Sequence, residues 1–273
     1  MLTRFARERP PVITRRDIEE ALAETGLHRG VDATVRELHR LGWLVPTHLK
    51  GAWAYLPPGE DAVTDPYVDL RAWRARDRDA VFALAGEAAA WHLGYLDRAF
   101  AGPTAIWIPN DRRLPHGLRP HLSVVRLGWR ADDAAELGPS PSLLHRRHLD
   151  LTRWATGLPG FGPETLVVQL ARRPSSFRAW TGLIDHLDLL AADCDPVRLS
   201  SLLDDQSSSA WQRTAYLLAR GDQRPAAVEV FARRPPGPLP KVQFGIGPNT
   251  MWDSEFKVSD ALLAPTQQTI GKA

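Results

Sequence analysis

The sequence predicts an α+β protein with two domains, one over residues 1–60 and a larger one over residues 67–273. Three observations lead to this prediction. The first sixty residues read as helix, short turn, helix and β-hairpin. Proline and glycine then cluster in Pro57-Pro58-Gly59 and Asp65-Pro66, as is typical of a linker. Beyond the linker, helical and strand patterns mix without an internal repeat, which indicates a mixed α/β domain.

The bulk composition is that of an ordinary globular protein. Of the 273 residues 44% are hydrophobic and 24% are charged. No run of 18 or more apolar residues is present, so no transmembrane helix is expected. The N-terminus lacks the apolar core of a signal peptide, so we expect a cytoplasmic protein without membrane contact. The single cysteine, Cys194, excludes an intramolecular disulfide and a cysteine-rich zinc site, and we expect it half-buried between helices.

Capping signals mark the first full helix. Thr14 and Asp17 place a hydroxyl three residues before a carboxylate, which fits a capping box. Gly26 ends the helix. Its apolar stripe consists of Ile18, Ala21 and Leu22. A shorter helix is expected before it, carried by Leu2, Phe5 and Ala6.

The next elements complete a recognisable order. A second helix is expected from Gly30 to Leu41 and is ended by Gly42. Two strands follow, over 43–45 and 52–56, with Gly51 in the turn between them. Helix, short turn, helix and hairpin is the order of a winged helix-turn-helix, a fold in which the second of these helices enters the major groove of DNA.

The second helix has a basic face opposite its apolar face. At 100° per residue the apolar sector contains Val31, Val35, Leu38, Leu41 and Gly42, whereas the opposite side contains Arg29, Ala33, Arg36 and Arg40. A small residue between arginines lets a helix approach a groove closely, and guanidinium groups bind guanine or phosphate. We therefore interpret this helix as a recognition helix. The alternative is an ordinary charged surface, on which Arg36 pairs with Asp32 at i,i+4.

Four further residues are candidates for DNA contact. Arg15 and Arg16 lie at the start of the first full helix, where a phosphate meets a helix N-terminus. His48 and Lys50 lie in the expected hairpin tip and would contact the adjacent backbone. Because one small domain makes few contacts, we expect a dimer on an inverted repeat of double-stranded DNA.

The larger region contains both element types and an uneven charge distribution. We expect helices over 78–96, 163–172, 177–191, 196–203 and 209–220, and strands over 105–109, 122–129, 242–245 and 255–258. Residues 207–209 are cap candidates for the last of these helices. Arginines concentrate in 112–178, whereas 181–210 contains six Asp against the single Arg198. This asymmetry indicates two faces that contact different partners or each other.

No constellation of residues predicts catalysis. His145 and His148 would share a face of a helix, but their segment reads as strand or loop, which argues against a metal site. Gly245 and Gly247 are followed by Pro248, which is unfavourable for a phosphate-binding turn. His92, among apolar residues, reads as a core histidine. We therefore predict no catalytic residue, metal or cofactor, and consider an enzyme acting on nucleic acid the weakest interpretation.

Several motifs in order resemble one protein family. The wing segment GAWAYLPPG is followed by AGEAAAWHLGYLDRAF (85–100), whose helix closes on His92-Leu93-Gly94-Tyr95. A Pro-Glu-x-Leu pattern follows at 163–167, and an Arg-to-Gly helix motif at 213–221. This order is similar to that of the AbiEi family, antitoxins of bacterial toxin–antitoxin operons of the mycobacterial and actinobacterial type. The motifs that carry the resemblance extend over nearly the whole chain.

The resemblance implies an N-terminal DNA-binding winged helix and a C-terminal antitoxin domain. It also implies autorepression through inverted repeats in the protein's own promoter, and a cognate nucleotidyltransferase toxin that the C-terminal domain counteracts. In this family a stable toxin–antitoxin complex is not required. The alternative function is that of an interaction protein that does not bind DNA and masks a partner toxin through its C-terminal domain.

Overall fold

The chain forms two compact units in the computed structural model. The structure describes residues 2–26, 30–127, 149–150, 157–204, 206–248 and 251–263. The first unit comprises Met1–Val81 and Leu114–His121, and the second comprises Phe82–Arg113 and Leu122–Ala273. The first unit therefore extends beyond residue 60, where the sequence predicted the end of the first domain.

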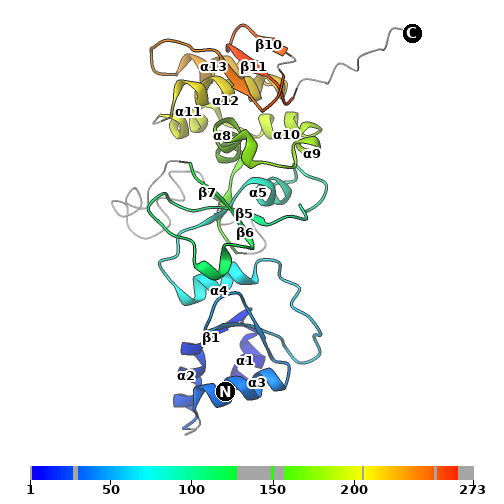
Figure 1. The fold of residues 1–273 in the computed structure, drawn as a ribbon, viewed down its shortest axis with the longest axis vertical. Helices are drawn as coiled ribbons and strands as arrows, with labels where there is room; N and C mark the ends of the chain where they lie inside the picture. Colours follow the sequence, from blue (N-terminus) through cyan, green and yellow to red (C-terminus); the bar gives the residue numbers. More distant parts are fainter. Residues whose placement is uncertain are drawn as a thin grey trace, which may run out of the picture. The chain divides into compact units, whose positions relative to one another are not determined.

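The first unit combines helices with a small antiparallel sheet (Figure 1). Its elements are α1 (Leu2–Glu8), β1 (Val12–Thr14), α2 (Arg15–Glu24), α3 (Val31–Arg40), β2 (Leu44–Pro46), β3 (Ala52–Tyr55) and α4 (Val68–Arg76). A short 3-10 turn, His116–Leu118, also belongs to this unit. The sheet order is β1-β3-β2, and both pairings are antiparallel. The predicted order of helix, turn, helix and hairpin is thus present.

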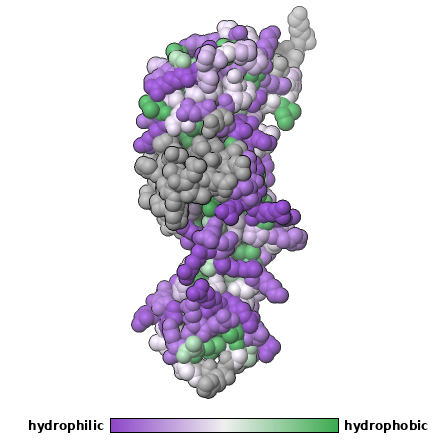
Figure 2. Space-filling view, turned by 90° about the vertical axis from the view of Figure 1, so that its left-hand side faces the viewer, coloured by the Kyte–Doolittle hydropathy of each residue, from purple (hydrophilic) through white to green (hydrophobic). Residues whose placement is uncertain are grey.

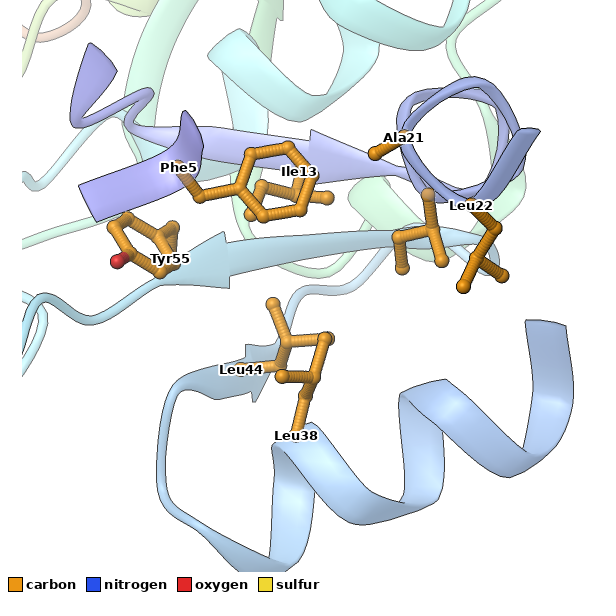
Figure 3. Packing of buried hydrophobic residues seen from close by; sticks show 8 residues of the cluster. Phe5, Ile13, Ala21, Leu22, Leu38, Leu44 and Tyr55 are labelled. Carbon is orange, nitrogen blue, oxygen red and sulfur yellow. The ribbon is translucent and has the colours of Figure 1, made fainter. Parts of the chain in front are cut away.

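A single apolar cluster holds these elements together (Figure 3). Phe5 of α1 and Tyr55 of β3 lie on one side of it, with ring centroids 6.3 Å apart. Leu38 of α3 points toward Leu44 of β2. The cluster also contains Ile13 of β1 and the predicted stripe of α2, namely Ile18, Ala21 and Leu22. The stripe predicted from the sequence is therefore confirmed as the buried face of α2.

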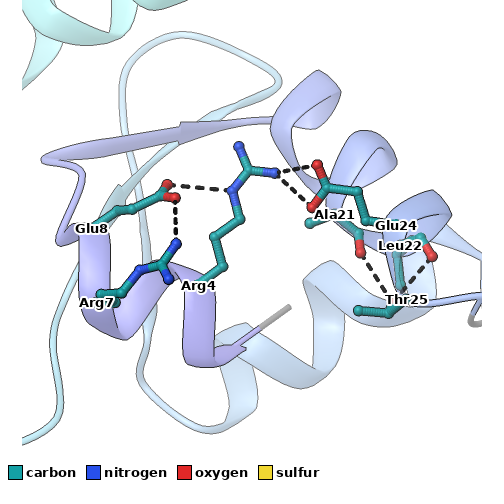
Figure 4. A network of polar contacts seen from close by, with 7 residues as sticks. All are labelled: Arg4, Arg7, Glu8, Ala21, Leu22, Glu24 and Thr25. Atoms are coloured by element: carbon teal, nitrogen blue, oxygen red, sulfur yellow. Dashed lines mark hydrogen bonds and ion pairs between the residues drawn. The ribbon is translucent and has the colours of Figure 1, made fainter.

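An ion-pair network joins α1 to the end of α2 (Figure 4). The guanidinium of Arg4 donates to Glu8 within α1 and to Glu24 at the end of α2 at 3.0 Å. The hydroxyl of Thr25 donates to the carbonyls of Ala21 and Leu22. Because the carbonyls of a last helical turn lack intrahelical donors, these bonds complete the end of α2.

The buried face of α3 differs from the predicted one at its end. Leu41 was predicted to be buried but is 45% exposed, and Gly42 is exposed as well. Thr34 is buried instead, at 3%, with its hydroxyl bonded to the carbonyl of Gly30. The helix ends at Arg40, and Gly42 adopts a left-handed φ of 75°. A helical wheel applied to Leu41 and Gly42 therefore continued the helix beyond its real end.

The second unit contains a five-stranded sheet. Its strands are β4 (Ala83–Leu84), β5 (Thr104–Trp107), β6 (Leu122–Val125), β7 (Leu149–Asp150) and β8 (Gly160–Phe161), in the order β6-β5-β4-β8-β7. The pairs β5–β6 and β4–β8 are parallel, and the other two are antiparallel. Helix α5 (Gly86–His92) packs on β5.

A buried helix connects this sheet to a helical group within the same unit. Helix α8 (Pro163–Arg172) is buried from Pro163 to Ala171 and lies between the sheet and the group formed by α10 to α13 (Figure 1). The other helices are α9 (Trp180–Ile184), α10 (Leu187–Ala192), α11 (Pro196–Leu203), α12 (Ser208–Arg220) and α13 (Arg224–Ala232). A second sheet has the order β10-β11-β9, from β9 (Val242–Phe244), β10 (Met251–Asp253) and β11 (Val258–Asp260).

Several predicted elements of this unit were wrong in extent. The strand expected over 122–129 ends at Val125, and its last two residues lie outside the described ones. The helix expected over 78–96 is confined to α5, because Gly86 has a φ of 51° and the preceding residues 83–84 form a strand. The helix expected over 177–191 divides into α9 and α10 around Asp185 and His186. The strand expected over 255–258 is mostly a turn, in which Asp253 accepts the amide protons of Glu255 and Phe256. Helices α4 and α13 were not predicted.

Candidate nucleic-acid interface

The capping box of α2 fixes two arginines at its N-terminus. Thr14 accepts the amide proton of Asp17 at 3.3 Å, and the Asp17 carboxylate accepts the Thr14 amide at 2.7 Å. Arg15 and Arg16 follow immediately, with exposed side chains that pair with Glu19 and Glu20 at i,i+4. The capping box predicted from the sequence is confirmed, and the cap places both predicted arginines at a helix N-terminus.

Arg15 also joins α2 to α3. Its guanidinium lies 2.6 Å from the carboxylate of Asp32, in the first turn of α3. This hydrogen bond lowers the pKa of the Asp32 carboxyl and raises the pKa of Arg15. Asp32 is therefore bound by Arg15, whereas Arg36, the predicted alternative partner, forms no ion pair with Asp32 and acts on it only through a weaker electrostatic attraction.

The structure describes two arginines on the predicted basic face of α3, Arg36 and Arg40, and they differ in their surroundings. Arg40 is bound through two nitrogens by Glu37, at 2.6 and 3.1 Å. Arg36 is exposed and forms no hydrogen bond or ion pair with the residues that the structure describes. Ala33 is partly exposed on the same helix. Arg29, the fourth residue of this predicted face, lies outside the described residues.

The hairpin tip is anchored to the rest of the first unit. Leu49 is buried. The amide of His48 donates to Asp69 of α4 at 2.9 Å, and its ring nitrogen Nδ1 lies 2.6 Å from the same carboxylate. The ring also stacks on that of His121, with centroids 3.5 Å apart. His48 thus holds the tip in place, whereas Lys50 is exposed and forms no ion pair with a described carboxylate.

The end of α4 and the turn after it add two cationic residues that the sequence did not single out, Arg76 and Arg78. The guanidinium of Arg76 donates to the backbone carbonyl of Lys50 at 3.0 Å, so the end of α4 lies beside the hairpin tip. Arg76 and Arg78 are both exposed. No motif marked them, because their position depends on the packing of α4 against β1 and β3.

A cavity lies where these elements meet. Its volume is about 600 Å³, and its wall combines the start of α2, Asp32 of α3, hairpin residues 50, 51 and 53, and the end of α4 with Arg78 just beyond it. Figure 2 shows that the surface of the first unit on the α2 side is largely hydrophilic, with hydrophobic atoms gathered in one smaller area. The first unit therefore presents charged side chains from four elements around one hollow.

The second unit has buried polar contacts that tie its elements together. The hydroxyl of Tyr216 donates to the buried carboxylate of Asp260 at 2.7 Å, and burial, followed by this hydrogen bond, raises the pKa of Tyr216. Asp260 also accepts the amide protons of Leu262 and Leu263. Arg213 donates from α12 to the carbonyl of Gln243 in β9. The motifs at 163–167 and 213–221, which resemble those of the AbiEi family, lie in α8 and at the end of α12. Both helices contribute many buried residues to this unit.

Other sequence-level candidates fall in three groups. Cys194 is buried, with its thiol bonded to the Leu190 carbonyl, and burial raises its pKa. His92 is half-buried, and burial lowers its pKa. His145 and His148 lie outside the described residues. Within the described ranges no group of three His, Cys, Asp or Glu is placed to hold a metal, and no helix is long and apolar enough to cross a membrane.

The family comparison concerns the second unit above all. The AbiEi antitoxin C-terminal domain matches residues 80–220 of this chain, slightly more than half of its length. No curated protein matches. The match extends from β4 and α5 to the end of α12, and so includes the buried helix α8 and its neighbours.

A solved structure matches over both units. It is the crystal structure of the RV2827C protein from Mycobacterium tuberculosis, which is 48% identical, with a TM-score of 0.84 over 99% of this chain and 93% of that one. At this identity and coverage the two chains share the same architecture from the first helix to the last sheet. With the AbiEi domain matching across the core of the second unit, the chain belongs to the AbiEi antitoxin family.

Proposed function

We propose that the first unit is a winged helix-turn-helix that binds double-stranded DNA and represses the protein's own operon. The order α1, β1, α2, α3 and hairpin supports the assignment of α3 as the helix that enters the major groove. The anchored hairpin is the corresponding wing. Arg15, Arg16, Ala33, Arg36, Arg40, His48 and Lys50, with Arg29, remain the proposed DNA-contacting set.

The main support for this proposal is that the exposed Arg36 forms no ion pair with any carboxylate that the structure describes. An arginine that already binds a carboxylate must break that pair before it binds DNA, whereas a free guanidinium does not. On α3 Arg36 is exposed and pairs with no carboxylate in the part of the chain that the structure describes, while Arg40 is held by Glu37. Arg36 is therefore the residue that we assign to a base edge, with guanine as its preferred partner.

A mobility-shift assay on the protein's own promoter tests the assignment. Arg36→Ala should weaken binding by about 10- to 100-fold, because loss of a bidentate base contact costs about 1–3 kcal/mol. The loss should be much smaller on unrelated duplex DNA. Arg233→Ala is the control, since Arg233 is an exposed arginine of the second unit at the C-cap of α13, paired with Glu229. Equal affinity of wild type and Arg36→Ala on the promoter would refute the groove-helix assignment.

The proposed operator has two half-sites. A single unit of this size offers one helix and one wing, so specific affinity requires two protomers on an inverted repeat. Titration of promoter DNA under stoichiometric conditions should saturate at two chains per operator. Saturation at one chain, with no loss on scrambling one half-site, would contradict the dimeric arrangement.

For the second unit we propose that it counteracts a nucleotidyltransferase-type toxin. Membership of the antitoxin family supports a toxin partner. If the toxin is contacted directly, helices α9 to α11 offer a suitable surface, because exposed Asp185 and Asp188 lie in the same segment as exposed Leu189 and Val197. Such a surface is complementary to a basic, RNA-handling protein.

The two roles are separable by experiment. Arg36→Ala should lose promoter binding and still rescue growth of cells that express the toxin encoded beside it. Co-purification of that toxin with Arg36→Ala would favour the interaction-protein alternative as the mechanism of neutralisation. Loss of rescue together with loss of promoter binding would instead tie neutralisation to DNA binding.

A further inference from the structure

We propose that the cavity between α2, the hairpin tip and the end of α4 binds backbone phosphates of DNA, and that Arg76 and Arg78 bind them together with Lys50. This inference rests on the proposed DNA binding of the first unit and extends the interface to α4, which is not part of the helix-turn-helix or the wing.

The first argument is the charge of the cavity wall. Five cationic residues line it, against two carboxylates: Arg15, Arg16, Lys50, Arg76 and Arg78, with Asp17 and Asp32. Both carboxylates are already engaged, because the Thr14 amide and hydroxyl bind Asp17 and the guanidinium of Arg15 binds Asp32. The excess positive charge therefore faces the hollow.

The second argument is which cations are available. Arg15 and Arg16 are paired with carboxylates. Lys50, Arg76 and Arg78 form no ion pair with any carboxylate that the structure describes. Among the described residues, Arg76 bonds only to the backbone carbonyl of Lys50, which places its guanidinium beside the hairpin tip that carries Lys50. An arginine fixed by one donor retains further donors for a phosphate oxygen.

The third argument is the position and composition of the hollow. It begins at the capped N-terminus of α2, where backbone amides and the helix dipole favour an anion. Because Asp32 lines the cavity, the cavity also lies beside the first turn of α3, the helix proposed to enter the groove. The partly exposed Trp53 contributes an apolar wall suited to a sugar ring. A volume of about 600 Å³ accommodates a phosphate together with its adjoining sugar.

The salt dependence of DNA binding tests the proposal in the full-length protein. The double variant Arg76→Gln plus Arg78→Gln should lose two phosphate contacts. The negative slope of log K against log salt should then become shallower by about 2, since each contact contributes about 0.9 to its magnitude. Affinity at low salt should fall on the order of tenfold, equally on promoter and unrelated duplex. Arg76→Lys plus Arg78→Lys should retain most of the slope, because a phosphate also binds an ammonium.

The control is Arg7→Gln, another exposed arginine of the first unit, which does not line the cavity. It should leave the slope unchanged. Circular dichroism and thermal melting of each variant establish that the fold is retained, as is expected for exposed side chains.

The outcomes separate this inference from the proposed function. If Arg36→Ala abolishes promoter preference while the Arg76/Arg78 glutamine variant keeps the wild-type slope, the DNA interface stands and the cavity proposal is overturned. If the wild type binds no duplex at all, both proposals are overturned. Calorimetric titration with inorganic phosphate distinguishes the source: a phosphate-binding cavity whose loss leaves DNA affinity intact would serve a small phosphorylated ligand, and the DNA-backbone assignment would be wrong.

Discussion

At the scale of single residues, the charge partners of α3 decide which arginine is available. Asp32 lies one helical turn before Arg36 and is the partner expected for it at i,i+4. Arg15 of the preceding helix takes this carboxylate instead, at 2.6 Å. The carboxylate of Asp32 is therefore bound by a residue 17 positions away in the chain. As a result, the exposed Arg36 is available to bind a ligand.

The pairing of Arg15 with Asp32 gives a prediction for pH titration. The folded-state pKa of Asp32 is depressed, mainly by the hydrogen bond from Arg15. The pair therefore stabilises the fold above the ordinary carboxyl pKa range and loses this effect as the pH falls through the folded-state pKa. NMR titration should place the Asp32 pKa below about 3.9, its ordinary value, and Arg15→Gln should raise it toward that value. An Asp32 pKa that does not respond to Arg15→Gln would contradict the pairing.

A buried hydroxyl in the second unit gives a prediction for stability. Tyr216→Phe removes the hydroxyl that donates to the buried Asp260 carboxylate, while the backbone amides of Leu262 and Leu263 still donate to it. Hydrogen bonds to charged groups contribute about 1.5–3 kcal/mol, so urea denaturation should show a loss of this size. Tyr95→Phe is the control: its hydroxyl bonds to the exposed Asp193, so the change should be smaller. Equal losses in both variants would indicate that the burial of Asp260 does not matter.

At the scale of elements, the ends of helices position the candidate site. The capping box sets the first residue of α2, and with it the position of Arg15 and Arg16 at the cavity wall. The position of the end of α4, by contrast, is set by the packing of this helix against β1 and β3. A shift of either helix end changes the cation spacing around the hollow, so local helix signals and tertiary packing both determine the interface.

The cap of α2 gives a matched pair of variants. Thr14→Ala removes the cap acceptor, which should destabilise the first unit by about 0.5–2 kcal/mol and weaken DNA binding. Ser207→Ala is the comparison, since Ser207 is the N-cap of α12 but its side chain makes no cap bond. We expect its effect to stay within about 0.5 kcal/mol. Thermal denaturation of both variants checks this, and equal effects would contradict a specific role for the Thr14 cap.

The close approach of α10 and α12 depends on one glycine. A Cβ at Gly221 would lie 2.5 Å from the carbonyl oxygen of Leu187 and 2.5 Å from the Cβ of Ala191. Gly221→Ala should therefore force the helices apart and cost about 1–3 kcal/mol in urea denaturation. Gly237→Ala has nothing within 4 Å of the added Cβ and should leave stability nearly unchanged. A neutral Gly221→Ala would show that α10 moves aside without cost.

At the scale of the whole molecule, the chain divides into two compact units with separate cores. The segment 114–121 belongs to the first unit although it follows the first strands of the second. Its His121 stacks on His48 of the hairpin tip, and a Cβ at Gly117 would lie 2.0 Å from the carbonyl oxygen of His48. A segment distant in sequence from the hairpin tip thus packs against that tip.

The division into units gives a prediction for unfolding. Leu38→Ala in the first core and Leu199→Ala in α11 each remove a buried side chain, at a cost of about 2–5 kcal/mol. We expect two calorimetric transitions. Leu38→Ala should lower the midpoint temperature of one, and Leu199→Ala the midpoint temperature of the other. In mobility shifts Leu38→Ala should lose promoter binding at a temperature where Leu199→Ala retains it. A single transition lowered equally by both variants would contradict independent units.

The sequence by itself determined most of the local structure, because caps, glycine turns and apolar periodicity act over a few residues. It predicted the first three helices and the hairpin of the first unit in order, although not β1, as well as the bounds of α8 and α11 and the apolar stripe of α2. It failed where the local signal was weak or contradicted by packing, as at α4, at the end of α3 and before Gly86. The family motifs occur in order along the chain, and the domain match over residues 80–220 confirms the family that they indicated.

The tertiary structure alone decided how the candidate site is assembled. It paired Asp32 with Arg15, left Arg36 unpaired, turned His48 toward Asp69 and His121, and placed Arg76 beside Lys50. These outcomes depend on distances between residues far apart in the chain, and electrostatic pairing falls off over a few ångströms. A helical wheel contains no such distances. The basic face was therefore readable from the sequence, whereas the availability of each of its cations was set by packing.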